Sequence, residues 1–186
     1  MSHALDPSIV ATGLDMLREH IAAVPDFPQT GILFRDITPA LADPKCLKTA
    51  VDLHLDAVAD MAGEIDAIVG IESRGFLFGM PMAMALGVGF VPARKPGKLP
   101  RKVHEQRYTL EYGEDALQMH EGDLQWGQKV LVVDDLLATG GTASATCALI
   151  EQTGAQVLGC LFLIELTALG GRGKLGGHRV NALIGY

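Results

Sequence analysis

Val130-Leu-Val-Val-Asp-Asp-Leu-Leu-Ala-Thr-Gly-Gly-Thr142 is the stretch of sequence that decides the fold. It opens with four consecutive apolar residues, mostly β-branched, a pattern typical of a strand covered on both faces. Two aspartates follow, and a glycine-rich turn then leads into the helical pattern of residues 143–152. A strand, a tight turn and a helix in this order indicate a βαβ unit and therefore a parallel sheet.

The polar half of this stretch suits a ribose phosphate. Successive N–H groups of a glycine turn can point inward at the positive end of the following helix, which makes a phosphate cradle. The lysine of a triphosphate-binding P-loop is absent from it. The predicted cradle consists of Ala138, Thr139, Gly140, Gly141 and Thr142.

The two carboxylates Asp134 and Asp135 are the candidate catalytic groups of the stretch. Adjacent carboxylates at a strand end repel one another and are costly to bury, so they require hydroxyl donors or a hydrated cation opposite them. A ribose with two hydroxyls meets that requirement. The alternative interpretation is structural, with Asp135 capping the next helix and Asp134 solvated.

Other segments repeat the buried-strand pattern and alternate with helical patterns. The expected strands are Ala67–Ile71, Val88–Val91, Ala155–Leu166 and Val180–Ile184. This alternation predicts an α/β fold with a mostly parallel central sheet flanked by helices. Ligands of such sheets bind beyond the carboxyl ends of the strands, so we expect the site just after Ile71, Val91 and Val133.

Two early helices are expected at Asp6-Pro7 and Asp43-Pro44, where a capping side chain precedes a proline at the first helical position. In the second helix an apolar stripe recurs at helical spacing and predicts the face that packs on the core. Its members are Leu47, Val51, Leu55 and Val58.

A run without charge, Phe76–Ala93, is nearly long enough to span a bilayer. It contains Pro81 and Pro92 and several glycines, so a buried helix followed by a buried strand explains it better than a membrane span. We therefore expect no membrane partner.

Length and charge point to one globular domain over residues 1–186 that does not bind nucleic acid. The chain is 48% hydrophobic with a net charge of -7, whereas a duplex partner requires a positive surface. Five of the 15 basic residues nevertheless lie in one nine-residue segment that should attract anions. That segment contains Arg94, Lys95, Lys98, Arg101 and Lys102.

The cysteines and histidines indicate neither disulfides nor a protein-built metal site. Cys46, Cys147 and Cys160 are odd in number and far apart, so buried reduced thiols are expected. The six histidines show no i, i+3 or i, i+4 pairing. The N-terminal residues show no secretory pattern, and together with the thiols this predicts a cytoplasmic protein.

The stretch 130–142 resembles the phosphoribosyl-pyrophosphate signature of the type I phosphoribosyltransferases. Residues 136–142 resemble the form of this motif that is found in the adenine-specific members. The resemblance implies that Asp134 and Asp135 hold the ribose hydroxyls and that residues 138–142 bind the 5′-phosphate. It also implies a homodimer.

Three further segments resemble the same family. Phe27–Thr38 resembles its N-terminal hood, about residues 25–38, in which Leu33, Phe34 and Arg35 would sandwich adenine. Glu72–Phe76 resembles its pyrophosphate loop with Arg74 as the cation, although the family often has aspartate where Glu72 stands. Arg94–Pro100 followed by Tyr108–Gly113 resembles its flexible catalytic loop, about residues 94–113.

The resemblance implies transfer of the phosphoribosyl group to N9 of adenine, giving AMP and pyrophosphate. Cations must meet the departing pyrophosphate, and Arg74, Lys98 and Arg94 or Lys95 suit that role. Mg²⁺ is expected to enter on the substrate's oxygens rather than in an all-protein cage.

Two less specific roles belong to the loop. Tyr108 would pack over the reacting centre when the loop closes, and Glu105 or Glu111 could manage the N9 proton. Two alternatives stay open: a different acceptor base, and a non-catalytic phosphoribosyl-pyrophosphate sensor. Gly171-Arg-Gly-Lys-Leu-Gly176 satisfies a dinucleotide-binding pattern but does not directly follow a strand, so it is expected to be a surface loop.

Overall fold

The computed structural model describes residues 4–109 and 114–186, so residues 110–113 of the expected catalytic loop lie outside the described residues. The chain divides into two compact units, one ending at Ala59 and one comprising Asp60–Tyr186. The expectation of a single domain over 1–186 stays a prediction.

The first unit contains three helices and a two-stranded antiparallel ribbon. Both predicted helix starts are confirmed, because Asp6 accepts a hydrogen bond from the N–H of Ser8 (2.8 Å) and Asp43 from the N–H of Cys46 (2.7 Å). The elements are α1 Pro7–His20, β1 Ala22–Pro25, β2 Leu33–Asp36, α2 Thr38–Ala42 and α3 Pro44–Asp56.

The buried face of α3 is not the predicted one. Its buried residues are Cys46, Ala50, Leu53 and His54. Of the predicted stripe, Leu47, Val51 and Leu55 are only partly buried, whereas Val58 is buried as predicted but follows the end of the helix at Asp56. Helix α1 approaches this helix closely: a Cβ atom at Gly13 would lie 2.9 Å from the side-chain methyl of Thr49. The small side chains of Cys46 and Ala50 let neighbouring elements approach the helix. A search for large apolar residues at helical spacing overlooks them and therefore predicts the wrong face.

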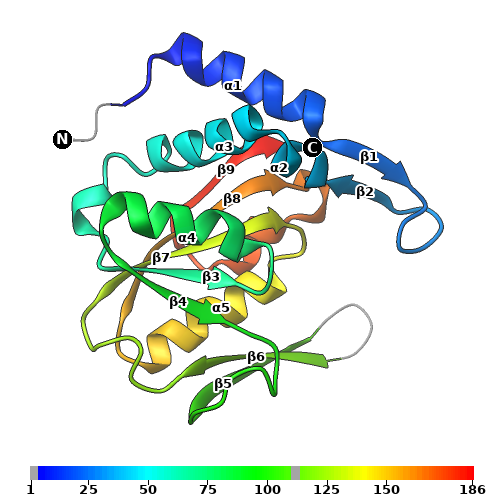
Figure 1. Ribbon diagram of the computed structural model, residues 1–186. Coiled ribbons are helices and arrows are strands. Elements are labelled where there is room, and N and C mark those ends of the chain that lie inside the picture. The colour runs from blue at the N-terminus through cyan, green and yellow to red at the C-terminus, as the bar shows by residue number, and fades with distance from the viewer. Residues whose placement is uncertain (1–3, 110–113) are drawn as a thin grey trace. The chain divides into compact units, whose positions relative to one another are not determined.

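The second unit is built on the predicted parallel sheet. Its strand order is β4-β3-β7-β8-β9, and every neighbouring pair is parallel. Helix α4 (Gly75–Leu86) covers one face and α5 (Gly141–Gln152) the other (Figure 1). The strands are β3 Ala67–Ile71, β4 Gly89–Ala93, β7 Lys129–Leu137, β8 Gln156–Glu165 and β9 Val180–Gly185.

The order of these strands creates a topological switch point between β3 and β7. From β3 the chain passes through α4 to β4 on one side, and from β7 it passes through α5 to β8 on the other. Right-handed crossovers in opposite directions place the two helices on opposite faces of the sheet. The connections therefore separate above the carboxyl ends of β3 and β7, where open α/β sheets bind ligands.

The segment expected as a long catalytic loop contains two strands. Strands β5 (Val103–Thr109) and β6 (Glu114–His120) form an antiparallel ribbon, and Arg94 bridges to Gln118 through two backbone hydrogen bonds of 2.8 and 2.7 Å. Leu117 and Met119 of β6 are buried in the core of the unit. The ribbon is therefore part of the packed structure at its base.

The charge-free run 76–93 forms most of α4 and all of β4, as predicted. Pro81 lies inside α4, which ends at Gly87 in the left-handed conformation (φ 70°). In the described parts of the chain, no helix combines the length and the apolar character needed to cross a membrane.

Candidate active site

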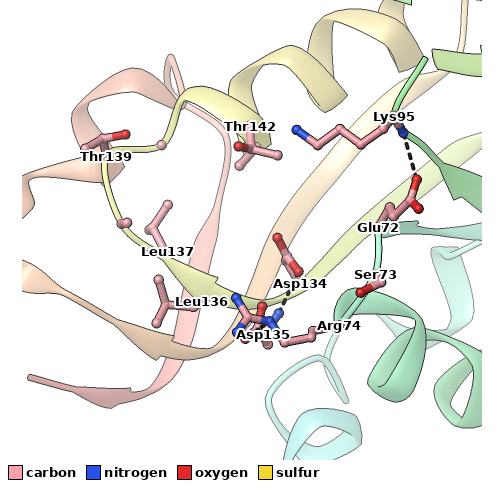
Figure 2. Close-up of a pocket in the computed structure, with 13 residues that line it drawn as sticks. Glu72, Ser73, Arg74, Lys95, Asp134, Asp135, Leu136, Leu137, Thr139 and Thr142 are labelled. Carbon is pink, nitrogen blue, oxygen red and sulfur yellow. Dashed lines mark hydrogen bonds and ion pairs between the residues drawn. The ribbon is translucent and has the colours of Figure 1, made fainter. Parts of the chain in front are cut away.

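A pocket of about 250 Å³ opens at the switch point (Figure 2). Its walls come from the ends of β3 and β7, from the turn that follows β7, and from one residue after β4. The lining residues are Glu72, Ser73, Arg74, Lys95, Asp134, Asp135, Leu136, Leu137, Ala138, Thr139, Gly140, Thr142 and Ala143.

The carboxylate pair forms the floor of this pocket. Asp134 and Asp135 lie within β7, which continues to Leu137, rather than after the strand as the sequence suggested. The side chain of Asp134 accepts from the N–H of Asp135 (2.9 Å), and Arg74 Nε lies 2.9 Å from Asp135 Oδ2. Asp135 is buried, so the alternative with Asp135 as a helix cap is wrong: α5 has Gly140 at its N-cap and no side-chain cap.

The two carboxyls differ in their electrostatic surroundings. Burial raises the pKa of Asp134 well above its ordinary value, and the adjacent Asp135 raises it further. Burial also raises the pKa of Asp135, but Arg74 opposes that shift. Asp135 therefore carries the charge that Arg74 balances, and Asp134 is the group whose ionisation requires a ligand or cation opposite it.

The predicted cradle lies between β7 and α5. Gly140 has a φ of +79°, which only glycine adopts without strain, and it starts α5. Ala138, Thr139, Gly140 and Thr142 line the pocket, while Gly141 is the first residue of the helix and is not among the lining residues. A twelve-residue helix thus directs its N-terminus at the pocket, as anion binding requires.

The loop after β3 supplies the opposite wall. Glu72 accepts from the N–H of Lys95 (2.8 Å) and from Arg94 Nη2 (3.1 Å), so it joins the end of β3 to the end of β4. Burial raises the pKa of Glu72, but these hydrogen bonds outweigh burial and hold it below its ordinary value. At Gly75 a Cβ atom would lie 2.4 Å from the carbonyl oxygen of Val133, so only glycine lets α4 start against β7.

Lys95 connects the pocket to the β5–β6 ribbon. Its ammonium forms an ion pair with Asp115 and donates to Tyr108 Oη (2.8 Å). Tyr108 Oη lies 3.2 Å from Asp115 Oδ2 and 3.5 Å from Thr142 Oγ1. Tyr108 is thus brought next to two lining residues, Lys95 and Thr142, although it does not itself line the pocket.

Three predicted residues are not brought into the pocket. Arg94 is held by Glu72 and donates to the carbonyl oxygen of Lys98 (3.2 Å), while the Lys98 side chain is exposed. Glu105 accepts from Gln118 (2.8 Å) on the other face of the ribbon. The proton-transfer role of Glu105 remains a prediction that this geometry does not support, and Glu111 lies outside the described residues.

The predicted hood residues belong to the first unit and lie on the β1–β2 ribbon. Leu33 is exposed and Phe34 and Arg35 are partly buried, in register with Pro25, Val24 and Ala23. The Phe27 and Phe34 rings meet edge to face with centroids 5.1 Å apart. The ribbon thus presents aromatic and aliphatic side chains.

Sequence reasoning missed several groups of this site. Ser73, Leu136 and Leu137 also line the pocket. Each is adjacent in sequence to a predicted site residue, and this proximity could have indicated them. The contacts of Glu72 and Asp115 join segments 22 and 20 residues apart, and no local pattern signals such contacts.

Comparison with known proteins agrees with the geometry. Residues 40–174 match the model of the phosphoribosyl transferase domain. The chain belongs to the phosphoribosyltransferase family. An adenine phosphoribosyltransferase of Francisella philomiragia is 54% identical over 93% of this chain and 99% of its own length.

Solved structures of phosphoribosyltransferases match along the whole fold. The adenine phosphoribosyltransferase of Thermoanaerobacter pseudethanolicus is 47% identical, with a TM-score of 0.89 over 93% of this chain and 99% of that one. The Saccharomyces cerevisiae enzyme, complexed with an imino-altritol bisphosphate and adenine, is 42% identical, with a TM-score of 0.88 over 93% and 99%. This phosphoribosyltransferase is thus a type I member whose central sheet and flanking helices follow those of its relatives.

Proposed function

We propose that this enzyme transfers the 5-phosphoribosyl group of phosphoribosyl pyrophosphate to N9 of adenine, giving AMP and pyrophosphate. One observation carries the proposal: a single pocket at the switch point combines a phosphate cradle, a carboxylate pair and two cations. The relatives support the choice of base, since those of 54% and 47% identity are named adenine phosphoribosyltransferases.

In the reaction the bond between the anomeric carbon and the pyrophosphate oxygen breaks, and pyrophosphate leaves with the electron pair. N9 of adenine forms the new bond to that carbon and loses its proton. Positive charge develops on the sugar and negative charge on the leaving group. We assign Asp134 and Asp135 to the ribose hydroxyls and Arg74 and Lys95 to the leaving group. Both cations line the same pocket, Arg74 beside Asp135 and Lys95 across the pocket from Asp134 (Figure 2).

We also propose that Mg²⁺ accompanies phosphoribosyl pyrophosphate. The pocket fits a hard cation, because its ionisable acceptors are carboxylate oxygens and Asp134 needs a positive charge or hydroxyl opposite it. When bound, the metal would neutralise charge on the diphosphate. Asp134 is the residue that would face it, through water or the ribose oxygens.

Adenine recognition by Leu33, Phe34 and Arg35 is proposed from the exposed apolar ribbon that carries them. A flat purine ring gains most from aromatic and aliphatic surfaces on its faces, with polar groups at its edge. Phe34→Ala and Arg35→Ala should raise KM for adenine while leaving KM for phosphoribosyl pyrophosphate nearly unchanged.

Two further properties are proposed. A homodimer is supported by an exposed apolar stripe on α4, formed by Leu77, Met80 and Met84. A cytoplasmic location is supported by the buried free thiols of Cys46, Cys147 and Cys160.

Incubation of the purified protein with phosphoribosyl pyrophosphate, magnesium and a panel of bases tests the proposed reaction. We expect pyrophosphate release with adenine and close 6-amino analogues. Release with hypoxanthine alone would overturn the base assignment. No release with any base, despite binding of phosphoribosyl pyrophosphate, would favour a sensor.

A further inference from the structure

The segment Gly171–Gly176 lies at the surface, as predicted, because Arg172, Gly173, Lys174 and Gly176 are exposed, but Gly171 is buried and packs against the phosphate cradle. Residues Gly171–Lys174 form the 3-10 turn η3. A Cβ atom at Gly171 would lie 2.2 Å from the carbonyl oxygen of Ala138, and one at Gly140 would lie 2.3 Å from the carbonyl oxygen of Gly171. The two backbones are therefore in direct contact, and the η3 turn forms the back wall of the cradle.

Arg172, the next residue, holds this turn in place through Glu165. Arg172 Nε donates to both carboxylate oxygens of Glu165 at 2.8 Å, and Nη2 lies 2.7 Å from Oε2. Arg172 Nη1 also donates to the carbonyl oxygen of Val180 (2.6 Å). Glu165 is buried, so its carboxylate depends on this partner. One guanidinium thus ties the η3 turn to β8 and β9.

Glu165 lies beside the start of the cradle in the sheet. It is the last residue of β8 and pairs in register with Leu137, the residue before Ala138. The N–H of Leu166 donates to the carbonyl oxygen of Leu137 (2.9 Å). Leu175, just after η3, is buried in the core and anchors the other end of the turn. The cradle is consequently fixed from β8 on one side and from η3 on the other.

We propose that Glu165 and Arg172 are positioning residues that fix the cradle for the 5′-phosphate. An anion is bound tightly only if its N–H donors are held within a fraction of an ångström of the right spacing. The Glu165–Arg172 pair supplies that rigidity without touching the ligand. This inference rests on the proposed function, because the 5′-phosphate is the ligand assigned to the cradle.

The test is calorimetric binding of two ligands to the whole protein. AMP carries the 5′-phosphate, whereas inorganic pyrophosphate with magnesium reports on Arg74 and Lys95. In Glu165→Gln/Arg172→Gln both charges are removed together, so no unpaired charge stays buried. We expect AMP to bind about tenfold more weakly, the scale of losses caused by changing groups that orient a ligand's contacts, with pyrophosphate affinity unchanged within about twofold.

Arg172→Lys serves as a milder variant that keeps the charge and loses the forked contact. Its AMP affinity should fall between those of the wild type and the double variant. Arg179→Lys is the matched control. Arg179 also donates two hydrogen bonds to one carboxylate, that of Asp60 (2.6 and 3.1 Å), but it lies just before β9 rather than beside the cradle. Its affinities should equal those of the wild type.

Equal AMP affinity in the wild type and in a folded double variant would overturn the positioning role. Parallel loss of AMP and pyrophosphate binding would do so as well, since it would indicate a general defect. A wild type that binds pyrophosphate but not AMP would instead refute the proposed function.

Discussion

Asp134 and Asp135 are chemically identical neighbours, and their surroundings separate them. Asp135 faces Arg74, while Asp134 has a raised pKa and faces the pocket. A carboxyl whose pKa is raised on folding lowers the stability as pH increases from its ordinary value to the raised one. Ionisation of Asp134 therefore destabilises the folded chain unless a hydroxyl donor or a cation lies opposite its carboxylate.

Asp134→Asn should consequently increase stability and abolish most of the activity. Because asparagine is neutral at every pH, we expect its Tm to exceed that of the wild type by at least about 2 °C at pH 8, roughly 1 kcal/mol for a chain of this size. The transfer rate should fall by about 100-fold or more, the range for losing one preorganised contact to a reacting group.

Scanning calorimetry between pH 4 and pH 8 measures this effect. The excess in Tm should shrink as the pH falls, since the wild-type carboxyl becomes protonated. Asp52→Asn, which removes a partner of an exposed ion pair on α3, is the control and should change Tm little at any pH. A lower Tm for Asp134→Asn at pH 8 would show that the carboxylate is structural.

Gly75 lies too close to β7 to carry a side chain without a shift of the backbone. Since its Cβ position lies 2.4 Å from the Val133 carbonyl oxygen, Gly75→Ala must displace α4 or β7. We expect a loss of about 1–3 kcal/mol in the free energy of unfolding, measured with urea. Gly63→Ala, where the same atom meets nothing within 4 Å, should stay near wild type. Equal stabilities of the two variants would contradict the close approach of α4 and β7.

Individual residues were predictable where one local segment contains the chemistry. The cradle and the aspartate pair are contiguous, and a strand followed by a glycine turn places them at the sheet edge. Glu72 and Asp115 were not predictable as contact residues, because each acts through a partner in another element. Their ionic partners become visible only once β3, β4 and β6 are assembled.

At the scale of elements, the β5–β6 ribbon is held near the pocket by Asp115. Burial raises the pKa of Asp115, but the ion pair with Lys95 outweighs it and holds the pKa below its ordinary value. Burial lowers the pKa of Lys95, and Asp115 and Tyr108 together raise it above its ordinary value. The lowered carboxyl pKa means that this contact stabilises the ribbon above the ordinary pKa of aspartate and is lost as pH falls through the lowered value.

Asp115→Asn should therefore loosen the ribbon at neutral pH. We expect faster amide hydrogen exchange over residues 103–109 at pH 7, with a global loss of at most about 1 kcal/mol because both side chains are partly solvated. The urea stabilities of variant and wild type should converge as the pH falls through the lowered pKa of Asp115. Glu105→Gln, on the other face of the same ribbon, should exchange as the wild type does; similar acceleration in both variants would contradict a specific role for Asp115.

The apolar strands of the central sheet were predicted well from the sequence, whereas the polar strands β5 and β6 were not. Strands β3, β7 and β8 contain continuous apolar runs, which indicate strands buried on both faces, while the outer strands β4 and β9 are mostly apolar and only partly buried. Strands β5 and β6 are polar and follow a proline- and glycine-rich segment, so their sequence predicts a long loop in which only the alternation of residues 108–112 suggests a short ribbon. Tertiary packing of Leu117 and Met119 decides their structure.

At the scale of the whole molecule, α4 has apolar residues all around it. One face packs on the sheet, while Leu77, Met80 and Met84 are 43%, 47% and 78% exposed. Positions i, i+3 and i+7 form one stripe on a helix. A continuous apolar stripe of this kind on a described surface favours a second copy of the chain as its partner.

Met80→Glu/Met84→Glu should convert the proposed dimer into monomers, because two carboxylates would be desolvated in the interface. Sedimentation velocity measures the change. Trp126→Gln replaces another exposed apolar residue, 87% exposed and outside α4, and should leave the dimer intact. An unchanged sedimentation coefficient for the α4 variant would contradict a dimer through this face.

The pairing of β3 with β7 has a consequence for synthesis on the ribosome. Registered partners such as Ala67 and Val130 are more than sixty residues apart, so the pocket closes only after β7 and α5 have emerged. A nascent chain that ends at β4 contains the loop after β3 without the carboxylates of β7, so the pocket is incomplete and its ligands cannot yet stabilise the chain by mass action. Phosphoribosyl pyrophosphate can thus stabilise the fold by binding only after the sheet through β7 has formed.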